Sequence, residues 1–157
     1  MYNQIAFQLK MVRKNNKLTQ KEFAHLIETT TRSLGRYEMG THRVTLYGLY
    51  KTNQLFHTDW SLWISDEKEE NTIHYTFPGT LIQQTTDKDS FYQTLGKRIT
   101  YLRKLNRLSQ RELSEQLGLT DRALAHYERG NRCIHLEDLI TLSKLLNVTP
   151  HELLYNL

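Results

Sequence analysis

Side chains able to recognise a partner by hydrogen bonding gather in the segment 109–130, SQRELSEQLGLTDRALAHYERG. Gln110, Asp121, Arg122 and His126 fall on one side of two short helical patterns whose other side is apolar. Amide and guanidinium groups can donate to acceptors such as phosphate or base oxygens, and a carboxylate can accept from an amino group. The chemistry open to these residues is therefore recognition of a polar partner.

Two short helices joined by a tight turn are expected to hold these residues in place. Ser109 is a candidate N-cap, and Glu112 completes a capping box with it. Gly118 can take the left-handed conformation that ends a helix, and Thr120 can cap the next one. A short helix pair with a glycine turn is typical of the helix-turn-helix motif, so the segment indicates DNA binding.

The same motif occurs a second time, 90 residues earlier. A shift of 90 positions aligns residues 5–64 with 95–154 without a gap. Identical pairs include caps, core and surface positions: Arg13/Arg103, Leu18/Leu108, Gln20/Gln110, Glu22/Glu112, Thr30/Thr120, Arg32/Arg122, Leu34/Leu124, Tyr37/Tyr127, Glu38/Glu128 and Gly40/Gly130. Agreement at all three kinds of position predicts an internal duplication, with a period too long for a solenoid repeat.

The duplication predicts an all-α fold of two tandem five-helix domains. We expect the domains at 1–64 and 92–157, joined by a linker at 65–91. The helices of the first are expected at 3–16, 20–27, 31–38, 46–56 and 60–64. Those of the second are expected at 92–106, 110–117, 121–128, 136–146 and 150–155. Residues with helical spacing form the second core: Ile99, Leu102, Leu113, Leu117, Leu124, Leu139, Leu142, Leu146 and Leu153.

The distribution of charge agrees with two similar modules. The 157 residues carry a net charge of +4, with net +5 in 1–64, −4 in 65–91 and +3 in 92–157. A mildly basic chain permits a polyanionic partner without requiring one. No apolar run approaches the roughly 20 residues that span a bilayer, and Cys133 has no second cysteine to pair with. We expect a cytoplasmic protein without membrane contact.

Two interpretations of the linker stay open. Residues 72–84 alternate polar and apolar side chains around Pro78-Gly79, a pattern typical of a β-hairpin. A lone hairpin is marginal in water, so it would pair with another chain. Alternatively, 65–91 is a flexible acidic linker with incidental apolar residues.

The second copy closely resembles the Cro/phage-repressor (Xre-type) helix-turn-helix family, whose domains are lambda-repressor-like. The resemblance rests on Gln110, Leu113-Ser114, Gly118, Leu124 and Tyr127-Glu128-Arg129-Gly130, and it extends more weakly to the first copy. It implies that the third helix of each domain lies in the DNA major groove. The DNA-contacting residues that it implies are Gln20, Thr30, Thr31, Arg32, Arg36, Arg43, Gln110, Thr120, Asp121, Arg122, His126, Arg129 and Arg132.

The resemblance also implies structural salt bridges from helix 1 to the end of helix 3, Arg13 to Glu38 and Arg103 to Glu128. Separate surface roles for these residues are the alternative. Asp121 likewise has two interpretations: it stabilises the helix N-terminus, or it accepts from a cytosine amino group.

The first copy departs from the family pattern at three places. Glu28-Thr29 stands where a turn glycine is usual, and Gly35 lies inside the third helix. Trp60 and Trp63, at helical spacing, are either core residues or a partner surface.

The leading function is a sequence-specific, double-stranded DNA-binding transcription regulator, a repressor acting as a homodimer. The alternative is a protein-interaction module, of antitoxin or anti-repressor type, in which DNA binding is secondary or limited to one domain. Seven histidines show no metal-ligand spacing and no phosphate loop is present, so we expect no metal, no cofactor and no enzymatic activity. The sequence does not identify an inducer.

Overall fold

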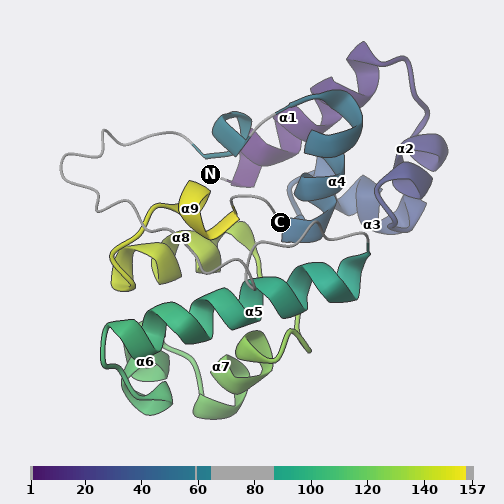
Figure 1. The fold of residues 1–157 in the computed structure, drawn as a ribbon. Coiled ribbons are helices and arrows are strands. Elements are labelled where there is room, and N and C mark those ends of the chain that lie inside the picture. The colour runs from purple at the N-terminus through teal and green to yellow at the C-terminus, as the bar shows by residue number, and fades with distance from the viewer. Residues whose placement is uncertain (1, 59, 65–86, 155–157) are drawn as a thin grey trace. The chain divides into compact units, whose positions relative to one another are not determined.

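The computed structural model describes residues 2–58, 60–64 and 87–154 (Figure 1). The chain divides into two compact units, residues 1–68 and 69–157, here called unit 1 and unit 2. All regular structure in the described residues is helical, as the sequence predicts. The hairpin considered for residues 72–84 lies outside the described residues.

Unit 1 contains four α-helices and a short 3-10 turn in its described part. These are α1 (Tyr2–Asn15), α2 (Gln20–Leu26), α3 (Thr31–Glu38), α4 (Leu46–Phe56) and η1 (Trp60–Leu62). The fifth helix, predicted at 60–64, is thus reduced to the 3-10 turn. The matching helix of unit 2 begins with a capping box between Thr149 and Glu152, whereas unit 1 has Leu62 at the position of Glu152. Unit 1 therefore lacks the carboxylate that completes such a box.

Unit 2 contains five α-helices in its described part. They are α5 (Lys88–Leu105), α6 (Gln110–Leu117), α7 (Asp121–Glu128), α8 (Leu136–Leu145) and α9 (Pro150–Leu154). The predicted start of the first, at residue 92, is wrong by four residues. Asp87 caps the longer helix, because its Oδ1 accepts from the backbone N–H groups of Asp89 and Ser90 over 2.9 Å each.

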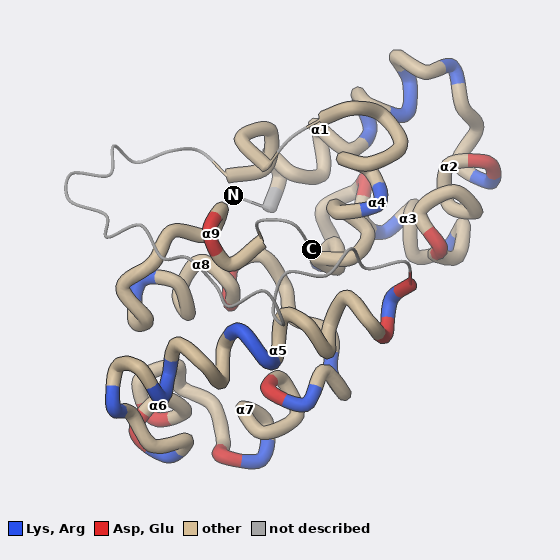
Figure 2. The backbone as a smooth tube through the Cα atoms, in the orientation of Figure 1, with Lys and Arg blue, Asp and Glu red and all other residues tan. Residues whose placement is uncertain are grey.

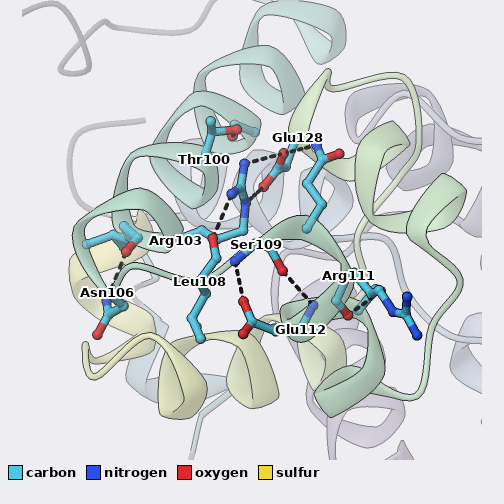
Figure 3. Close-up of polar contacts among 12 residues, drawn as sticks. Thr100, Arg103, Asn106, Leu108, Ser109, Arg111, Glu112 and Glu128 are labelled. Carbon is cyan, nitrogen blue, oxygen red and sulfur yellow. Dashed lines mark hydrogen bonds and ion pairs between the residues drawn. The ribbon is translucent and has the colours of Figure 1, made fainter.

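The caps predicted for the second motif are confirmed (Figure 3). The Ser109 hydroxyl accepts from the backbone N–H of Glu112 over 3.1 Å, and the Glu112 carboxylate accepts from the backbone N–H of Ser109 over 2.7 Å. Gly118 ends α6 with a φ of +66°, and the Thr120 side chain accepts from the first turn of α7. These local interactions set where α6 stops and where α7 starts.

The core of each unit lies between the motif helices and the helices that flank them. Eight of the nine predicted core residues of unit 2 are buried, and Leu117 is half-buried instead. The added turn of α5 contributes Phe91, which is fully buried. Arg98 is also fully buried, and its Nη1 donates to the carbonyl oxygen of Leu153 over 2.8 Å, which ties α5 to α9. Burial lowers the pKa of Arg98 to about 10.

The turn of the first motif holds a strained residue where the second has glycine. Glu28 has a φ of +55°, the left-handed region that favours glycine. Its carboxylate accepts from the Tyr47 hydroxyl over 3.1 Å and pairs with the Lys51 ammonium at 3.0 Å, so α4 holds the turn in place. Trp63 is buried, which confirms its core role, and Trp60 is half-buried.

Candidate nucleic-acid interface

The C-terminal end of α7 is fixed to α5 by a buried ion pair (Figure 3). Arg103 donates from Nε and Nη2 to the two oxygens of Glu128 over 2.5 and 3.2 Å. The remaining Nη1 donates to the carbonyl oxygen of Leu108 over 2.8 Å, at the turn before α6. One guanidinium therefore connects α5, the end of α7 and the entry to α6. Removing one partner of a buried pair leaves an uncompensated charge, so this connection is costly to break.

Unit 1 repeats the arrangement with closely similar geometry. Arg13 donates from Nε and Nη2 to Glu38 over 2.5 and 2.9 Å, and from Nη1 to the carbonyl oxygen of Leu18 over 2.9 Å. Burial acts to raise the pKa of Glu38, but hydrogen bonds from Arg13 and Gln20 outweigh it. The pKa of Glu38 therefore lies below its ordinary value.

The glutamine at the start of each motif is attached to these ion pairs. Gln110 donates from Nε2 to Glu128 over 2.6 Å, and Gln20 donates from Nε2 to Glu38 over 2.9 Å. Each amide is thus oriented by the carboxylate at the end of the third helix. The sequence prediction lacks this contact, since it places both glutamines only among the DNA-contacting residues. Their contact with nucleic acid stays a prediction.

The residues predicted to read bases lie at the surface of their own units. Four of them are exposed in the first turns of α3 and α7: Thr31, Arg32, Asp121 and Arg122. One turn later, Arg36 and its counterpart His126 are half-buried. The first turn of α7 carries both signs of charge, whereas that of α3 has no acidic residue (Figure 2).

Thr30 and Thr120 act as caps of these helices. Thr30 Oγ1 accepts from the backbone N–H of Ser33 over 3.0 Å, and Thr120 Oγ1 accepts from that of Ala123 over 3.2 Å. The two hydroxyls therefore fix the start of each candidate reading helix, whatever else they contact.

A second contact absent from the sequence prediction holds the Asp121 side chain. Ser114 is fully buried on α6, and its Oγ lies 2.5 Å from Oδ1 of Asp121. Unit 1 has Ala24 and Thr31 at the matching positions, so it has no equivalent pair. The two residues stand seven apart, and only the crossing of α6 and α7 brings them together. The sequence does contain one signal for this contact, because Ser114 and Asp121 both differ from their counterparts in the first copy.

The basic residues after each third helix are also placed at the surface. Arg129 and Arg132 are exposed, and the Arg132 guanidinium lies 5.6 Å from the centre of the Tyr127 ring. In unit 1 Arg43 is exposed in the corresponding loop. Loops that adjoin a reading helix are well placed to contact phosphates, which position a protein without specifying bases.

Comparison with known families agrees with this geometry. The family model described as helix-turn-helix, of the Cro/C1 type, matches the chain twice, at residues 9–51 and 99–153. The chain belongs to the helix-turn-helix family. The double match confirms the two tandem copies, and each match includes both helices of its motif. This helix-turn-helix family is one of DNA-binding transcription regulators.

Other comparisons add no closer relationship for this helix-turn-helix protein. No curated protein and no solved structure matches the chain. None of the helices in the described ranges combines the length and hydropathy needed to cross a membrane. Among the same residues, no group of three or more His, Cys, Asp and Glu side chains is arranged to hold a metal ion.

Proposed function

We propose that this protein is a sequence-specific, double-stranded DNA-binding transcription regulator of the repressor type, with a binding rather than a catalytic role. The observation that carries the proposal is the same in both units. The first turn of the third helix is exposed, while its two ends are fixed by a threonine cap and by a buried arginine–glutamate pair. A rigid helix with exposed polar residues at its N-terminus suits insertion into a major groove.

The proposed contacts divide into two kinds. Arg32 and Arg122, near the N-termini of α3 and α7, can each fork onto the O6 and N7 acceptors of a guanine. Arg43, Arg129 and Arg132 follow the third helices and are proposed to bind phosphates. The base contacts specify the DNA sequence, whereas the phosphate contacts fix the position of the protein on the DNA.

The test of this function is selection from a random duplex pool, followed by titration of the selected duplex by fluorescence anisotropy. We expect a defined motif, and a logarithm of affinity that falls steeply with the logarithm of salt concentration, because phosphate contacts release counterions. Arg32→Ala and Arg122→Ala should weaken the selected duplex by about 5- to 150-fold, and random DNA much less. Lys144→Ala removes an exposed charge at the end of α8 and is the matched control.

Two outcomes would count against the proposal. A flat response to salt would exclude phosphate-driven DNA binding. An equal loss on selected and random DNA would show that the substituted arginine binds only the backbone. The proposed homodimer is tested separately by light scattering across protein concentration, with and without the duplex.

The interaction-module alternative is favoured by two exposed apolar side chains of unit 1. Phe7 on α1 is 63% exposed and Met39 at the end of α3 is 69% exposed. The turn after Met39 lies against α1, since a Cβ at Gly40 would be 3.8 Å from that of Ala6. Trp63 does not contribute to such a surface, because it is buried. A stoichiometric partner that is retained at high salt and lost in Phe7→Ser would support this alternative.

A further inference from the structure

The first turns of α3 and α7 offer different hydrogen-bonding groups at matched positions. α3 has Thr31 followed by Arg32, and α7 has Asp121 followed by Arg122. An arginine can only donate, an ionised aspartate can only accept, and a threonine hydroxyl can do either. The two helices are therefore unlike where they are most exposed.

One oxygen of the acceptor on α7 lies against a buried hydroxyl. The buried Ser114 hydroxyl lies 2.5 Å from Oδ1 of Asp121 and 2.9 Å from the carbonyl oxygen of Arg111. Its single proton can serve one of them at a time, and 2.5 Å is within the range of a hydrogen bond to a carboxylate. When Ser114 donates to Oδ1, Oδ2 of this exposed side chain stays available to an external donor.

Unit 1 lacks both members of this pair. Ala24, at the position of Ser114, is buried and has no hydroxyl, and Thr31 has no carboxylate. The duplication therefore supplies a matched pair of helix-turn-helix motifs in one chain. They share their caps and their ion pairs, and they differ in the Ser114–Asp121 pair.

The inference rests on the DNA binding proposed above. We propose that the two units prefer different half-sites, and that Asp121, positioned by Ser114, gives unit 2 a preference for cytosine. In the major groove cytosine offers its amino group as a donor, whereas guanine offers two acceptors and thymine an acceptor and a methyl group. Adenine also offers an amino group, but its N7 acceptor lies beside that group and repels a carboxylate. A carboxylate facing guanine or thymine places acceptor against acceptor. Unit 1 has Arg32 and Arg36 and no carboxylate at the matched position, so it prefers guanine.

The experiment is selection from a random duplex pool with the full chain and with reciprocal variants. The wild-type protein is expected to select two unlike half-sites, one with a dominant cytosine. Asp121→Thr combined with Ser114→Ala gives unit 2 the residues of unit 1 and should reduce the preference for that cytosine about tenfold. Thr31→Asp combined with Ala24→Ser should create a cytosine preference in the other half-site.

Two single variants guard against a loss of folding. Thr31→Asp changes only an exposed residue of unit 1, so it tests whether the carboxylate alone brings a cytosine preference to unit 1 without altering the core. Ser114→Ala keeps the carboxylate and should weaken the cytosine preference without abolishing it, as expected of a positioning residue. If the Ser114–Asp121 pair were merely structural, Ser114→Ala would lower the unfolding midpoint, measured by far-UV circular dichroism, and leave the base preference unchanged.

The outcomes separate this inference from the function on which it rests. If the wild-type protein binds no duplex at low salt, the proposed DNA binding itself is wrong. If it binds DNA but all half-sites share one sequence, or if the double variant of unit 2 keeps its cytosine preference, the unequal reading is overturned and DNA binding stands. Unlike half-sites that change with the exchanged residues support it.

Discussion

Gly130 sets the direction in which the chain leaves α7 and enters the loop with Asn131 and Arg132. It has a φ of +73°, and a Cβ at this position would lie 2.5 Å from the backbone nitrogen of Gln93 on α5. Backbone atoms of a packed helix cannot easily move aside. The glycine therefore serves two purposes, a left-handed turn and close approach of the loop to α5.

We expect Gly130→Ala to reduce the unfolding free energy of unit 2 by about 2–5 kcal/mol, because conformational strain and steric overlap add. Urea unfolding followed by far-UV circular dichroism measures the loss. Gly118→Ala is the matched control, since Gly118 has a φ of +66° but no neighbouring atom within 4 Å of its Cβ position. It should lose only about 1–2 kcal/mol. Equal losses would show that the contact with α5 has no effect.

Glu38 should make the stability of unit 1 depend on acid pH. Its pKa in the folded chain lies below the ordinary value of 4.5. Its stabilising effect is therefore present above pH 4.5 and is lost as the pH falls through the lowered pKa. Both tryptophans of the chain, Trp60 and Trp63, belong to unit 1, so their fluorescence follows its unfolding. We expect the unfolding free energy to fall below pH 4.5.

Glu38→Gln tests the origin of that dependence. It should cost about 3–5 kcal/mol at about pH 7 and flatten the acid dependence, because Arg13 is left without its carboxylate. Gln20→Ala is a milder variant that removes one hydrogen bond to Glu38 and should cost about 1 kcal/mol. If wild type and Glu38→Gln lose stability in parallel as the pH falls, other carboxylates determine the acid response.

The ion pairs of the site are predictable from the sequence because the family resemblance implies them in both copies. Arg103 and Glu128 recur at the same spacing in the first copy, and the structure joins both pairs. The contact between Ser114 and Asp121 is not predictable in this way, because it depends on how α6 crosses α7. A linear pattern identifies which residues share a face of one helix, but not which atoms of two helices meet.

Helix boundaries are predictable where their caps are local. The start of α6 follows from Ser109 and Glu112, which form its capping box. The start of α5 does not follow from the repeat, because residues 88–91 precede the region in which the copies align. Only the Asp87 cap marks the true start, and it lies in a stretch that the sequence analysis assigns to the acidic linker.

The third helix of unit 1 contains a residue that limits its stability. Gly35 lies inside α3, and apart from its chain neighbours and the nearby backbone of α3, no atom lies within 4 Å of the position that its Cβ would occupy. Gly35→Ala should therefore stabilise unit 1 by about 0.5–1 kcal/mol, measured as a higher urea midpoint of tryptophan fluorescence. Ala125→Gly makes the reverse change at the matched position of α7 and should destabilise unit 2 by a similar or larger amount, since Ala125 is half-buried. A lower midpoint for Gly35→Ala would contradict the space seen around this residue.

Duplication gives this protein two versions of the same motif in one chain. The versions agree in the caps and in the ion pairs that hold the third helix. They differ at the exposed first turn of that helix and in the residue that forms the turn before it. The features shared by both copies are those that the fold requires, and the differences are where the copies can diverge in binding.

The two units should therefore unfold in separate steps, with unit 1 first. Unit 1 has Glu28 in a left-handed turn and Gly35 inside a helix, where unit 2 has Gly118 and Ala125. Each difference costs unit 1 about 1 kcal/mol. During urea titration, the tryptophan fluorescence change should be complete while circular dichroism still reports the helices of unit 2. Gly35→Ala should raise the urea midpoint of unit 1 and so narrow the difference between the midpoints of the two units. Gly130→Ala should lower the midpoint of unit 2 and so narrow or reverse that difference. Coincident curves for both probes in the wild type and in both variants would mean that the chain unfolds as one cooperative body.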